Sequence, residues 1–311
     1  VGNALIDMYA KCGNLMKAQE VFDDLPVHDT VSWTVLIAGY AQHGHSEEAL
    51  NQYDRMQQDG FSGNNAIFLS ILKACSVIGD PKQCDYIHSK IEKHGLFEKD
   101  HVLGTMLVDA YAKCGSFSKA RDVFEKIPVQ DVVLWNTMIS GYVQQEHHEE
   151  ALKCFDQMHV RGISPNAATF VSITKACCSI GSIEKGQNIH MEIVKKGFVE
   201  TDVAIVNTLI DMYAKCGCLT IANQIFNRLP IKDVASWNAL IAGYAQIGDS
   251  ENIFSLFDEM IANHIKPDLI TFVILLNTCT RVLLFQRSQT YFESMSKDYG
   301  ISPSLEHHSC V

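Results

Sequence analysis

The chain has 311 residues, 47% of them hydrophobic and 20% charged, so it can bury a large core and does not have the composition of a disordered segment. Its formal net charge of −11 argues against an indiscriminate polyanion binder, so any nucleic-acid site must be a local basic or neutral groove. No apolar run is long enough to cross a bilayer, which argues against a membrane-spanning helix.

The eleven cysteines are odd in number and follow the internal repeats, which predicts reduced thiols in an intracellular compartment rather than disulfides. The opening VGNALIDMYAKCG already has the pattern of a folded unit, and the closing LEHHSCV stops where a unit would begin. No signal or transit segment is recognisable. We therefore expect the sequence to be part of a longer chain.

The chain repeats itself at long range. The pentapeptide YAKCG starts at Tyr9, Tyr111 and Tyr213, so successive copies are displaced by 102 residues. The same displacement relates three further sets of residues: Trp33, Trp135 and Trp237; Cys75, Cys177 and Cys279; and Pro26, Pro128 and Pro230. A fixed period shared by unrelated residue types indicates a solenoid.

Each 102-residue cycle divides into units of 35, 36 and 31 residues, and each unit has the pattern of two helices. In the unit 30–64, apolar residues recur at helical spacing in two stripes: Trp33, Leu36, Ile37 and Tyr40, then Ala49, Leu50, Tyr53 and Met56. Gly44 separates the stripes, Ser46 is the expected N-cap of the second helix, and Gly60 ends it. The pattern predicts an all-α array of helix–turn–helix units.

Near the start of the three 35-residue units stand SWTVLIAGYAQHG, LWNTMISGYVQQE and SWNALIAGYAQIG, and two of these units close with GISPN and HIKPD. These segments resemble the first helix and the closing turn of the pentatricopeptide repeat (PPR) family. The alternation of unit lengths resembles the plant PLS subclass, with its P, L and S units. Two segments are similar to its L and S patterns, respectively: VSITKACCSIGSIEKGQNIHMEIVKKG and NTLIDMYAKCG. The P-type units are then 30–64, 132–166 and 234–268; the L-type units 65–100, 167–202 and 269–304; the S-type units 101–131 and 203–233; 1–29 is a partial S-type unit and 305–311 a truncated stub.

The resemblance implies a right-handed superhelical solenoid that binds single-stranded RNA in a mitochondrion or chloroplast and contributes to editing or processing. Helper proteins that contact L units are expected partners. The sequence departs from the pattern at three turns. Gly63 replaces the proline of later P units, while Glu146 and Leu283 replace inter-helix glycines. The last departure makes the unit 269–304 the one whose geometry is hardest to predict.

In this family each base meets the fifth and last residues of one unit. A carboxylate only accepts hydrogen bonds, whereas an amide both donates and accepts, so a last Asp favours U or G and a last Asn favours C or A. A fifth Asn leaves room for a pyrimidine and a shorter Thr for a purine. Single-stranded RNA exposes the base edge that these residues would contact.

The predicted base-reading pairs are Asn3 with Asp29 (U), Thr34 with Asn64 (A), Thr105 with Asp131 (G), Asn136 with Asn166 (C), Asn207 with Asp233 (U) and Asn238 with Asp268 (U). Three pairs receive no base, because their fifth residue has no hydrogen-bonding side chain: Leu69 with Asp100, Val171 with Asp202 and Val273 with Ser304. Since family members run parallel to RNA, the predicted target is 5′-UAnGCnUUn-3′. The alternative is that these side chains only cap helices.

Two further positions carry predictions. The second residue of four units is aliphatic (Val31, Val102, Val133 and Ala235), and in the family it wedges between bases; plain packing between units is the alternative. Lysines recur in the first helix of S units (Lys11, Lys113 and Lys215), where they would contact phosphate or remain solvated.

No residue pattern supports catalysis, a cofactor or a metal. His147-His148-Glu149 matches the H-x-E of zinc deaminases, but the chain has no C-x-x-C, and neither Cys177–Cys178 nor Cys216–Cys218 has finger spacing. The tryptophans lie on the apolar stripe, so we expect them to pack in the core rather than stack on bases. The chain is thus expected to bind RNA without being an enzyme. The alternative is a helical scaffold that holds a protein or peptide.

Overall fold

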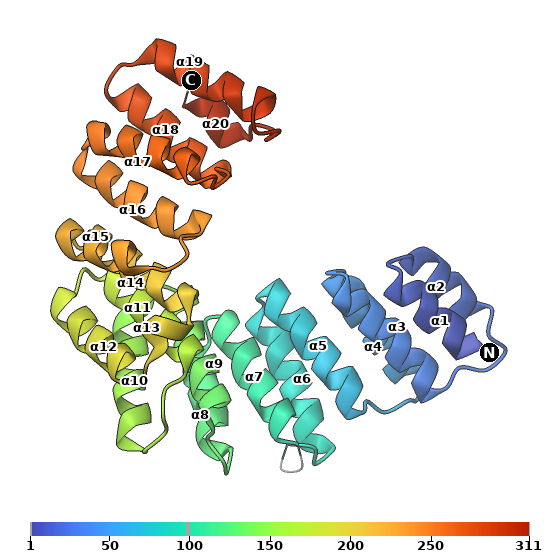
Figure 1. Ribbon diagram of the computed structural model, residues 1–311. Coiled ribbons are helices and arrows are strands. Elements are labelled where there is room, and N and C mark those ends of the chain that lie inside the picture. The colour runs from blue at the N-terminus through green and yellow to red at the C-terminus, as the bar shows by residue number, and fades with distance from the viewer. Residues whose placement is uncertain (1, 98–99, 311) are drawn as a thin grey trace. The chain divides into compact units, whose positions relative to one another are not determined.

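A computed structural model describes residues 2–97 and 100–310, and every regular element in those ranges is a helix (Figure 1). The predicted all-α helical-repeat fold is confirmed. Residues 1, 98–99 and 311, which fall in the predicted units 1–29, 65–100 and 305–311, lie outside the described residues. The chain forms two compact units, Val1–Ser164 and Pro165–Val311.

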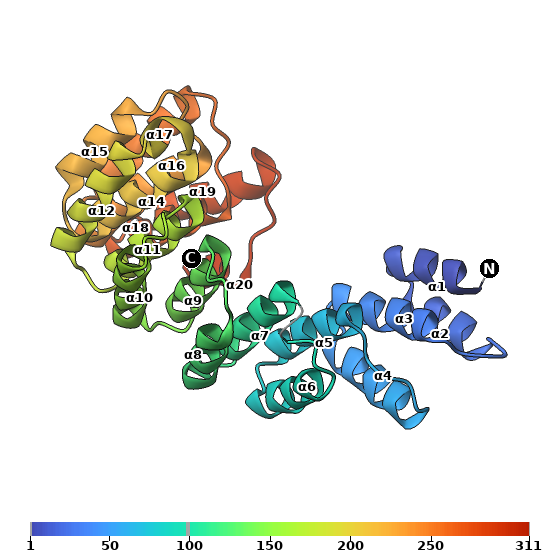
Figure 2. The ribbon, with the colours of Figure 1, turned by 90° about the horizontal axis from the view of Figure 1, so that it is seen from below.

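The first compact unit contains five helical hairpins: α1 (Gly2–Lys11) with α2 (Leu15–Asp23), α3 (Thr30–Gln42) with α4 (Ser46–Gln58), α5 (Asn65–Ile78) with α6 (Pro81–Lys93), α7 (His101–Lys113) with α8 (Phe117–Lys126), and α9 (Val132–Gln144) with α10 (His148–Val160). The first helices α1, α3, α5, α7 and α9 pack side by side in one layer (Figure 2). The second helices form the other layer, and α2, α4 and α6 also pack against the first helix of the following hairpin.

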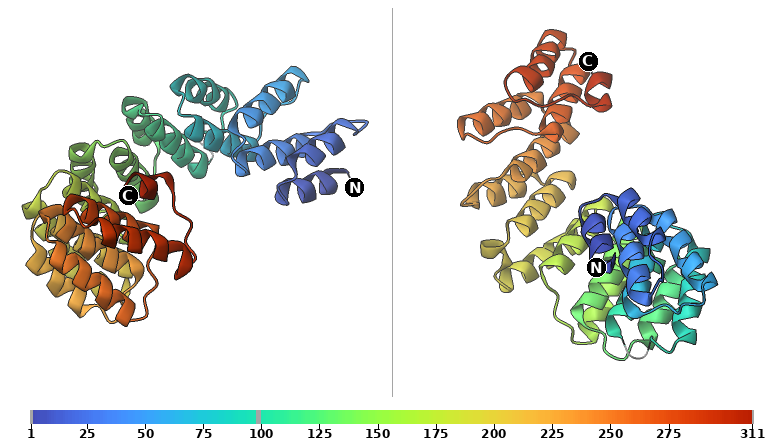
Figure 3. Two further views of the ribbon diagram at one scale, coloured as in Figure 1. Left: turned by 90° about the horizontal axis from the view of Figure 1, so that it is seen from above. Right: turned by 90° about the vertical axis from the view of Figure 1, so that its right-hand side faces the viewer.

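The second compact unit repeats this arrangement. Its helices are α11 (Ala167–Ser179), α12 (Ile183–Lys195), the short α13 (Phe198–Thr201), α14 (Val203–Lys215), α15 (Leu219–Arg228), α16 (Val234–Ile247), α17 (Ser250–Ala262), α18 (Leu269–Arg281), α19 (Phe285–Lys297) and α20 (Leu305–Ser309). The first helices α11, α14, α16 and α18 follow one another in a layer (Figure 3). The sequence pattern did not predict α13.

First helices begin at Thr30, Asn65, His101, Val132, Ala167, Val203, Val234, Leu269 and Leu305, where the predicted repeats begin. Their assignment to P, L or S types stays a prediction. One predicted cap is wrong: Ser46 is the first helical residue of α4, and the N-cap is His45, which makes no side-chain capping bond. Ser46 is buried at the helix start, so its hydroxyl is not placed as a cap.

The turns inside the hairpins require left-handed backbone. Gly44 has φ of +81° and Gly248 of +80°, a conformation that costs glycine little. Glu146 and Leu283, which replace glycine in this turn, have φ of +61° and +58° and so keep the same left-handed backbone, although residues other than glycine are strained there. The turn of the unit 269–304 is therefore kept despite the substitution, and α19 follows it as α12 follows Gly181.

Recurrent contacts hold neighbouring hairpins together. The rings of Trp237 and Phe226 meet edge to face at 4.8 Å, and the three tryptophans are at most 2% exposed. The expected core role of the tryptophans is therefore confirmed. In the first-helix layer a Cβ on Gly243 would lie 2.4 Å from the Cβ of Ala214, so α14 and α16 approach too closely for a larger residue.

Candidate nucleic-acid interface

The last residue of each predicted unit is the N-cap of the next first helix. Asp268 Oδ1 accepts the Thr271 backbone N–H at 2.9 Å, and Asp233 Oδ1 accepts that of Ser236 at 2.8 Å. The other N-caps are Asp29, Asn64, Asp100, Asp131, Asn166, Asp202 and Ser304. Capping is therefore part of the role of these residues, as the alternative interpretation predicts. It uses only part of the hydrogen-bonding capacity of a carboxylate or an amide.

Three of the predicted pairs with a fifth Asn are joined directly. Asn3 Nδ2 lies 3.2 Å and 3.3 Å from the two carboxylate oxygens of Asp29. Asn207 Nδ2 lies 3.0 Å and 3.2 Å from those of Asp233. The structure therefore brings together fifth and last residues that are 26 positions apart in sequence.

The Asn238–Asp268 pair is more enclosed. Asn238 Nδ2 donates to Asp268 Oδ1 at 2.9 Å, and the Thr271 hydroxyl donates to Asn238 Oδ1 at 2.7 Å. Asn238 is only 6% exposed, while Asp268 is half-buried. In the described part of the chain Asp268 Oδ2 accepts no hydrogen bond, so it remains available to a donor. The Thr271 contact was not predicted from the sequence.

The two predicted pairs with a fifth Thr differ from each other in their hydrogen bonds. Asn64 Nδ2 donates to the Thr34 hydroxyl at 3.2 Å, whereas the Thr105 hydroxyl donates to the His101 carbonyl at 3.0 Å instead of to Asp131. Asn136 lies on α9 in the first compact unit, and Asn166 caps α11 in the second.

The pairs without a predicted base lack a direct polar contact between their members, because the fifth residues Leu69, Val171 and Val273 are aliphatic. Asp100 accepts from Asn65 Nδ2 at 2.5 Å and caps α7. Asp202 accepts the backbone N–H of Ile205 at 3.2 Å. Ser304 forms a capping box with His307.

The charge of one carboxylate is set by its cap. The backbone N–H of Ser32 donates to Asp29 Oδ1 at 2.7 Å, and this bond lowers the pKa of the Asp29 carboxyl. Burial raises the pKa of this carboxyl and is the second-largest influence, while hydrogen bonds from the Asn3 amide and the Ser32 hydroxyl each lower it by a smaller amount. Asp29 is therefore an acceptor, rather than a donor, at neutral pH.

The second residues of the units are exposed. Val31, Val102 and Val133 are 56%, 57% and 56% exposed, and Ala235 is also exposed. This exposure leaves an aliphatic surface beside each N-cap, which plain packing between units would have buried.

Each recurrent lysine has an acidic partner four residues earlier. Lys11, Lys113 and Lys215 lie 2.6 Å, 2.7 Å and 2.9 Å from the carboxylates of Asp7, Asp109 and Asp211. The repeated Asp-x-x-x-Lys spacing could have predicted these ion pairs. A phosphate would have to share or displace each aspartate.

The cysteines and the H-x-E segment do not gather into a metal centre. In the described ranges no three His, Cys, Asp or Glu side chains are placed to hold a metal ion. Burial raises the pKa of Cys177 and of Cys178 to about 11, which keeps both thiols protonated. His147 is the N-cap of α10, and Glu149 lies in the first turn of that helix.

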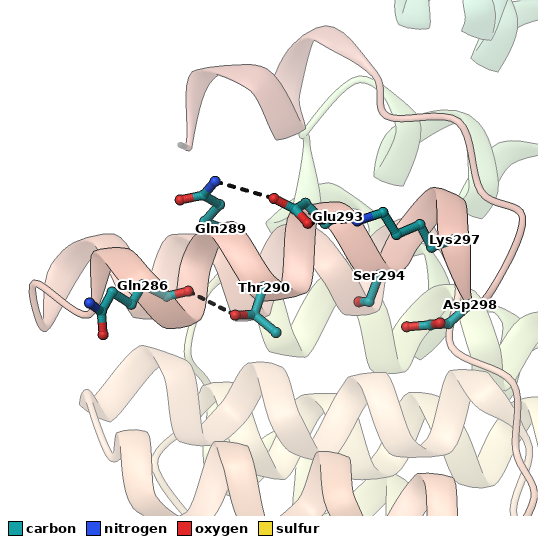
Figure 4. Close-up of a pocket in the computed structure, with 7 residues that line it drawn as sticks. All are labelled: Gln286, Gln289, Thr290, Glu293, Ser294, Lys297 and Asp298. Atoms are coloured by element: carbon teal, nitrogen blue, oxygen red, sulfur yellow. Dashed lines mark hydrogen bonds and ion pairs between the residues drawn. The ribbon is translucent and has the colours of Figure 1, made fainter.

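The surface also carries an open polar hollow on α19 that involves no predicted site residue (Figure 4). It has a volume of about 510 Å³ and is lined by Gln286, Gln289, Thr290, Glu293, Ser294, Lys297 and Asp298. Two of its three charged side chains are paired with each other, because Lys297 Nζ lies 2.8 Å from Glu293 Oε2. Among the described helices none is long and apolar enough to span a bilayer.

Two protein-family profiles, both of which describe repeats, match segments of this chain. A profile described as the PPR repeat family matches residues 28–77, 130–179 and 232–281, and one described as PPR repeat matches 3–29, 105–132 and 204–234. A pentatricopeptide repeat-containing protein of Arabidopsis thaliana is 38% identical over 311 residues, which is 100% of this chain and 42% of the relative.

Two other relatives from Arabidopsis thaliana have organellar names. A chloroplastic pentatricopeptide repeat-containing protein is 34% identical over 323 residues, covering 100% of this chain and 36% of its own length. A mitochondrial pentatricopeptide repeat-containing protein is 36% identical over 329 residues, which is 99% of this chain and 36% of the relative. The chain thus spans less than half the length of these curated relatives.

Solved structures share the fold. The crystal structure of the pentatricopeptide repeat protein PPR10 in complex with an 18-nt psaJ RNA element has a TM-score of 0.77 at 21% identity, covering 100% of this chain and 47% of that one. The crystal structure of PPR10 from maize has a TM-score of 0.68 at 16% identity, and the match covers 99% of this chain and 50% of that one.

Proposed function

The chain belongs to the pentatricopeptide repeat family, and on this basis we propose that it binds single-stranded RNA sequence-specifically, with about one base per helical hairpin. The observation that carries the proposal is the joined Asn–Asp pair at one position of successive hairpins. In the second compact unit, Asn207 meets Asp233 and Asn238 meets Asp268. Each pair puts amide donors beside a carboxylate acceptor.

This arrangement complements uracil. The pairing edge of uracil has an imino N–H donor between two carbonyl acceptors. Asp268 Oδ2 would accept the imino hydrogen, while the second N–H of Asn238 Nδ2 would donate to a carbonyl. The same donor and acceptor types at Asn3–Asp29 and Asn207–Asp233 give U at the first and seventh bases. With A, G and C at the other assigned pairs, the proposed target is 5′-UAnGCnUUn-3′.

Exposed aliphatic side chains and lysines complete the proposed interface. Val31, Val102, Val133 and Ala235 would wedge between successive bases, which their exposure supports. Lys11, Lys113 and Lys215 would contact phosphate by sharing or leaving their aspartate partners. Because the chain is acidic overall, attraction to RNA must come from such local groups.

The alternation of unit lengths supports membership of the PLS subclass, and with it a role in positioning an organellar transcript for editing or processing. The mitochondrial and chloroplastic names of relatives support an organellar location. Helper proteins would dock near the L units. In this proposal the chain binds and positions RNA, and catalysis belongs to other proteins.

The proposal predicts selective binding by the full 311-residue chain. Labelled 5′-UAAGCAUUA-3′ should bind at least about a hundredfold more tightly than 5′-AGUAUACAU-3′, which has the same composition and mismatches all six assigned bases, because each mismatch costs about 1–3 kcal/mol. Three phosphate contacts at about 0.7 each predict a slope of about −2 for log K against log salt. Fluorescence anisotropy measures both quantities.

The two contrary outcomes have different meanings. Equal binding of both RNAs would refute the base assignment while leaving RNA binding intact. If neither RNA binds, the RNA proposal fails and the scaffold alternative, a protein or peptide held on the first-helix layer, replaces it.

A further inference from the structure

One buried hydroxyl outside the predicted base-reading pairs contacts a base-reading amide. Thr271, at the third position of the unit that follows Asn238, is fully buried, and its hydroxyl lies 2.7 Å from Asn238 Oδ1. The same oxygen lies 3.0 Å from Asp268 Oδ1, but a hydroxyl has one hydrogen, and the Asn238 contact is the shorter. The Asn238 amide is thus held at both ends, by Thr271 at its oxygen and by Asp268 at its nitrogen.

The preceding pair lacks this contact. Ser236 occupies the position equivalent to Thr271, but its hydroxyl donates to the Asp233 backbone carbonyl at 2.7 Å. In the described part of the chain, Asn207 Oδ1 is buried without a hydrogen-bond partner. The Asn207 amide is therefore held only at its nitrogen end, by Asp233.

The sequence couples the two positions throughout the chain. Each of the four units with a fifth Asn is followed by a unit with Ser or Thr at its third position: Asn3 by Ser32, Asn136 by Thr169, Asn207 by Ser236, and Asn238 by Thr271. The five units with a fifth Thr, Leu or Val are followed instead by Ile67, Leu103, Leu134, Ile205 and His307. A hydroxyl at the third position thus accompanies an amide at the fifth position of the previous unit.

We propose that Thr271 is a positioning residue for base recognition, which holds Asn238 with its nitrogen toward Asp268 and the base. The inference rests on the proposed RNA-binding function. The two ends of an amide are similar in size, so hydrogen bonds decide its orientation. A flipped Asn238 would oppose its oxygen to the Asp268 carboxylate and offer no donor to uracil. A pre-set amide avoids the cost of ordering it when RNA binds.

The test compares the affinities of the full chain for 5′-UAAGCAUUA-3′ and for the same RNA with C at the first, the seventh or the eighth base. Thr271→Val removes the hydroxyl and keeps the shape, so the preference for U over C at the eighth base should fall about threefold to tenfold, while that at the seventh base should not change. The reverse variant, Ser236→Thr, places at this position the residue type that holds Asn238 and should raise the preference for U at the seventh base.

A matched control separates positioning from stability. Ser32→Ala removes the Ser32 hydroxyl that forms a capping box with Asp29, as Thr271 does with Asp268. Among the described residues Ser32 forms no hydrogen bond with the fifth-position Asn3. This variant should lower the melting temperature without changing the preference for U over C at the first base, which the neighbouring Asn3–Asp29 pair is proposed to read. A purely structural role for Thr271 would behave in the same way.

The outcomes distinguish this inference from the function on which it rests. If Asp268→Asn changes the eighth-base preference and Thr271→Val does not, the inference is wrong and the base-reading pair stands. If neither variant changes that preference, the Asn238–Asp268 pair does not read the base. The base assignment and the positioning role of Thr271 are then both wrong.

Discussion

Asp268→Asn should change the base preferred at the eighth position of the RNA from U to C. The substitution replaces the acceptor Oδ2 with an amide nitrogen, which repels the imino N–H of uracil and can donate to the ring nitrogen of cytosine. The ratio of the dissociation constants for C and U should change by roughly tenfold to a hundredfold, since a good bidentate contact discriminates by about 1–3 kcal/mol. Anisotropy titrations with four nonamers that differ only at the eighth base measure this ratio.

Asp202→Asn is the matched control for that experiment. Asp202 also caps a first helix, but its fifth-position partner is the aliphatic Val171. Asn caps helices about as well as Asp, so both variants should keep the fold. For Asp202→Asn the preference is measured at the sixth base, which faces the unit of Val171 and Asp202. A change there as large as the change at the eighth base with Asp268→Asn would show that capping, and not pairing with Asn238, controls recognition.

Trp237→Ala should lower the free energy of unfolding by about 3–5 kcal/mol, the usual cost of removing a large buried aromatic side chain. Trp237 is 1% exposed and packs edge to face on Phe226, so truncation leaves a cavity between two neighbouring hairpins. Equilibrium urea unfolding followed by circular dichroism measures the loss. It should appear first in the transition of the second compact unit, because repeats depend on their nearest neighbours.

Trp237→Phe is the control for the indole ring. The Trp237 Nε1 hydrogen has no partner among the described residues, so phenylalanine sacrifices volume but no hydrogen bond, and the loss should be clearly smaller than with alanine. A loss below about 1 kcal/mol with Trp237→Ala would contradict the core role.

The hairpin pattern could be predicted because a helix-capping residue precedes each first helix from α3 onward, and each of these helices carries its own apolar stripe. Local features of this kind are visible within one unit, as at Asp29 and Thr30. The cap of α4 was predicted one residue late, because Ser46 looks like a cap but is buried as the first helical residue. The short helix α13 follows Gly197, whose left-handed backbone redirects the chain in a stretch without an apolar stripe.

The site was predictable in its residue types but not in its contacts. The resemblance to the repeat family pointed to Asn238 and Asp268, yet neither periodicity nor composition shows that Thr271 holds the Asn238 amide. That bond joins residues 33 positions apart and depends on the rotamers of buried side chains. The signal that could have revealed it is the pairing of a fifth Asn with a hydroxyl at the next third position.

A crystal structure of the chain bound to 5′-UAAGCAUUA-3′ tests the central claim most directly. The quantity to measure is the distance from Asp268 Oδ2 to N3 of the eighth base. We expect about 2.7–3.2 Å, the range of an N–H···O hydrogen bond, with the base lying between the aliphatic second residues of adjacent units. An eighth base that lies away from the first-helix layer, with Asn238, Asp268 and Thr271 still bonded only to one another, would contradict the account.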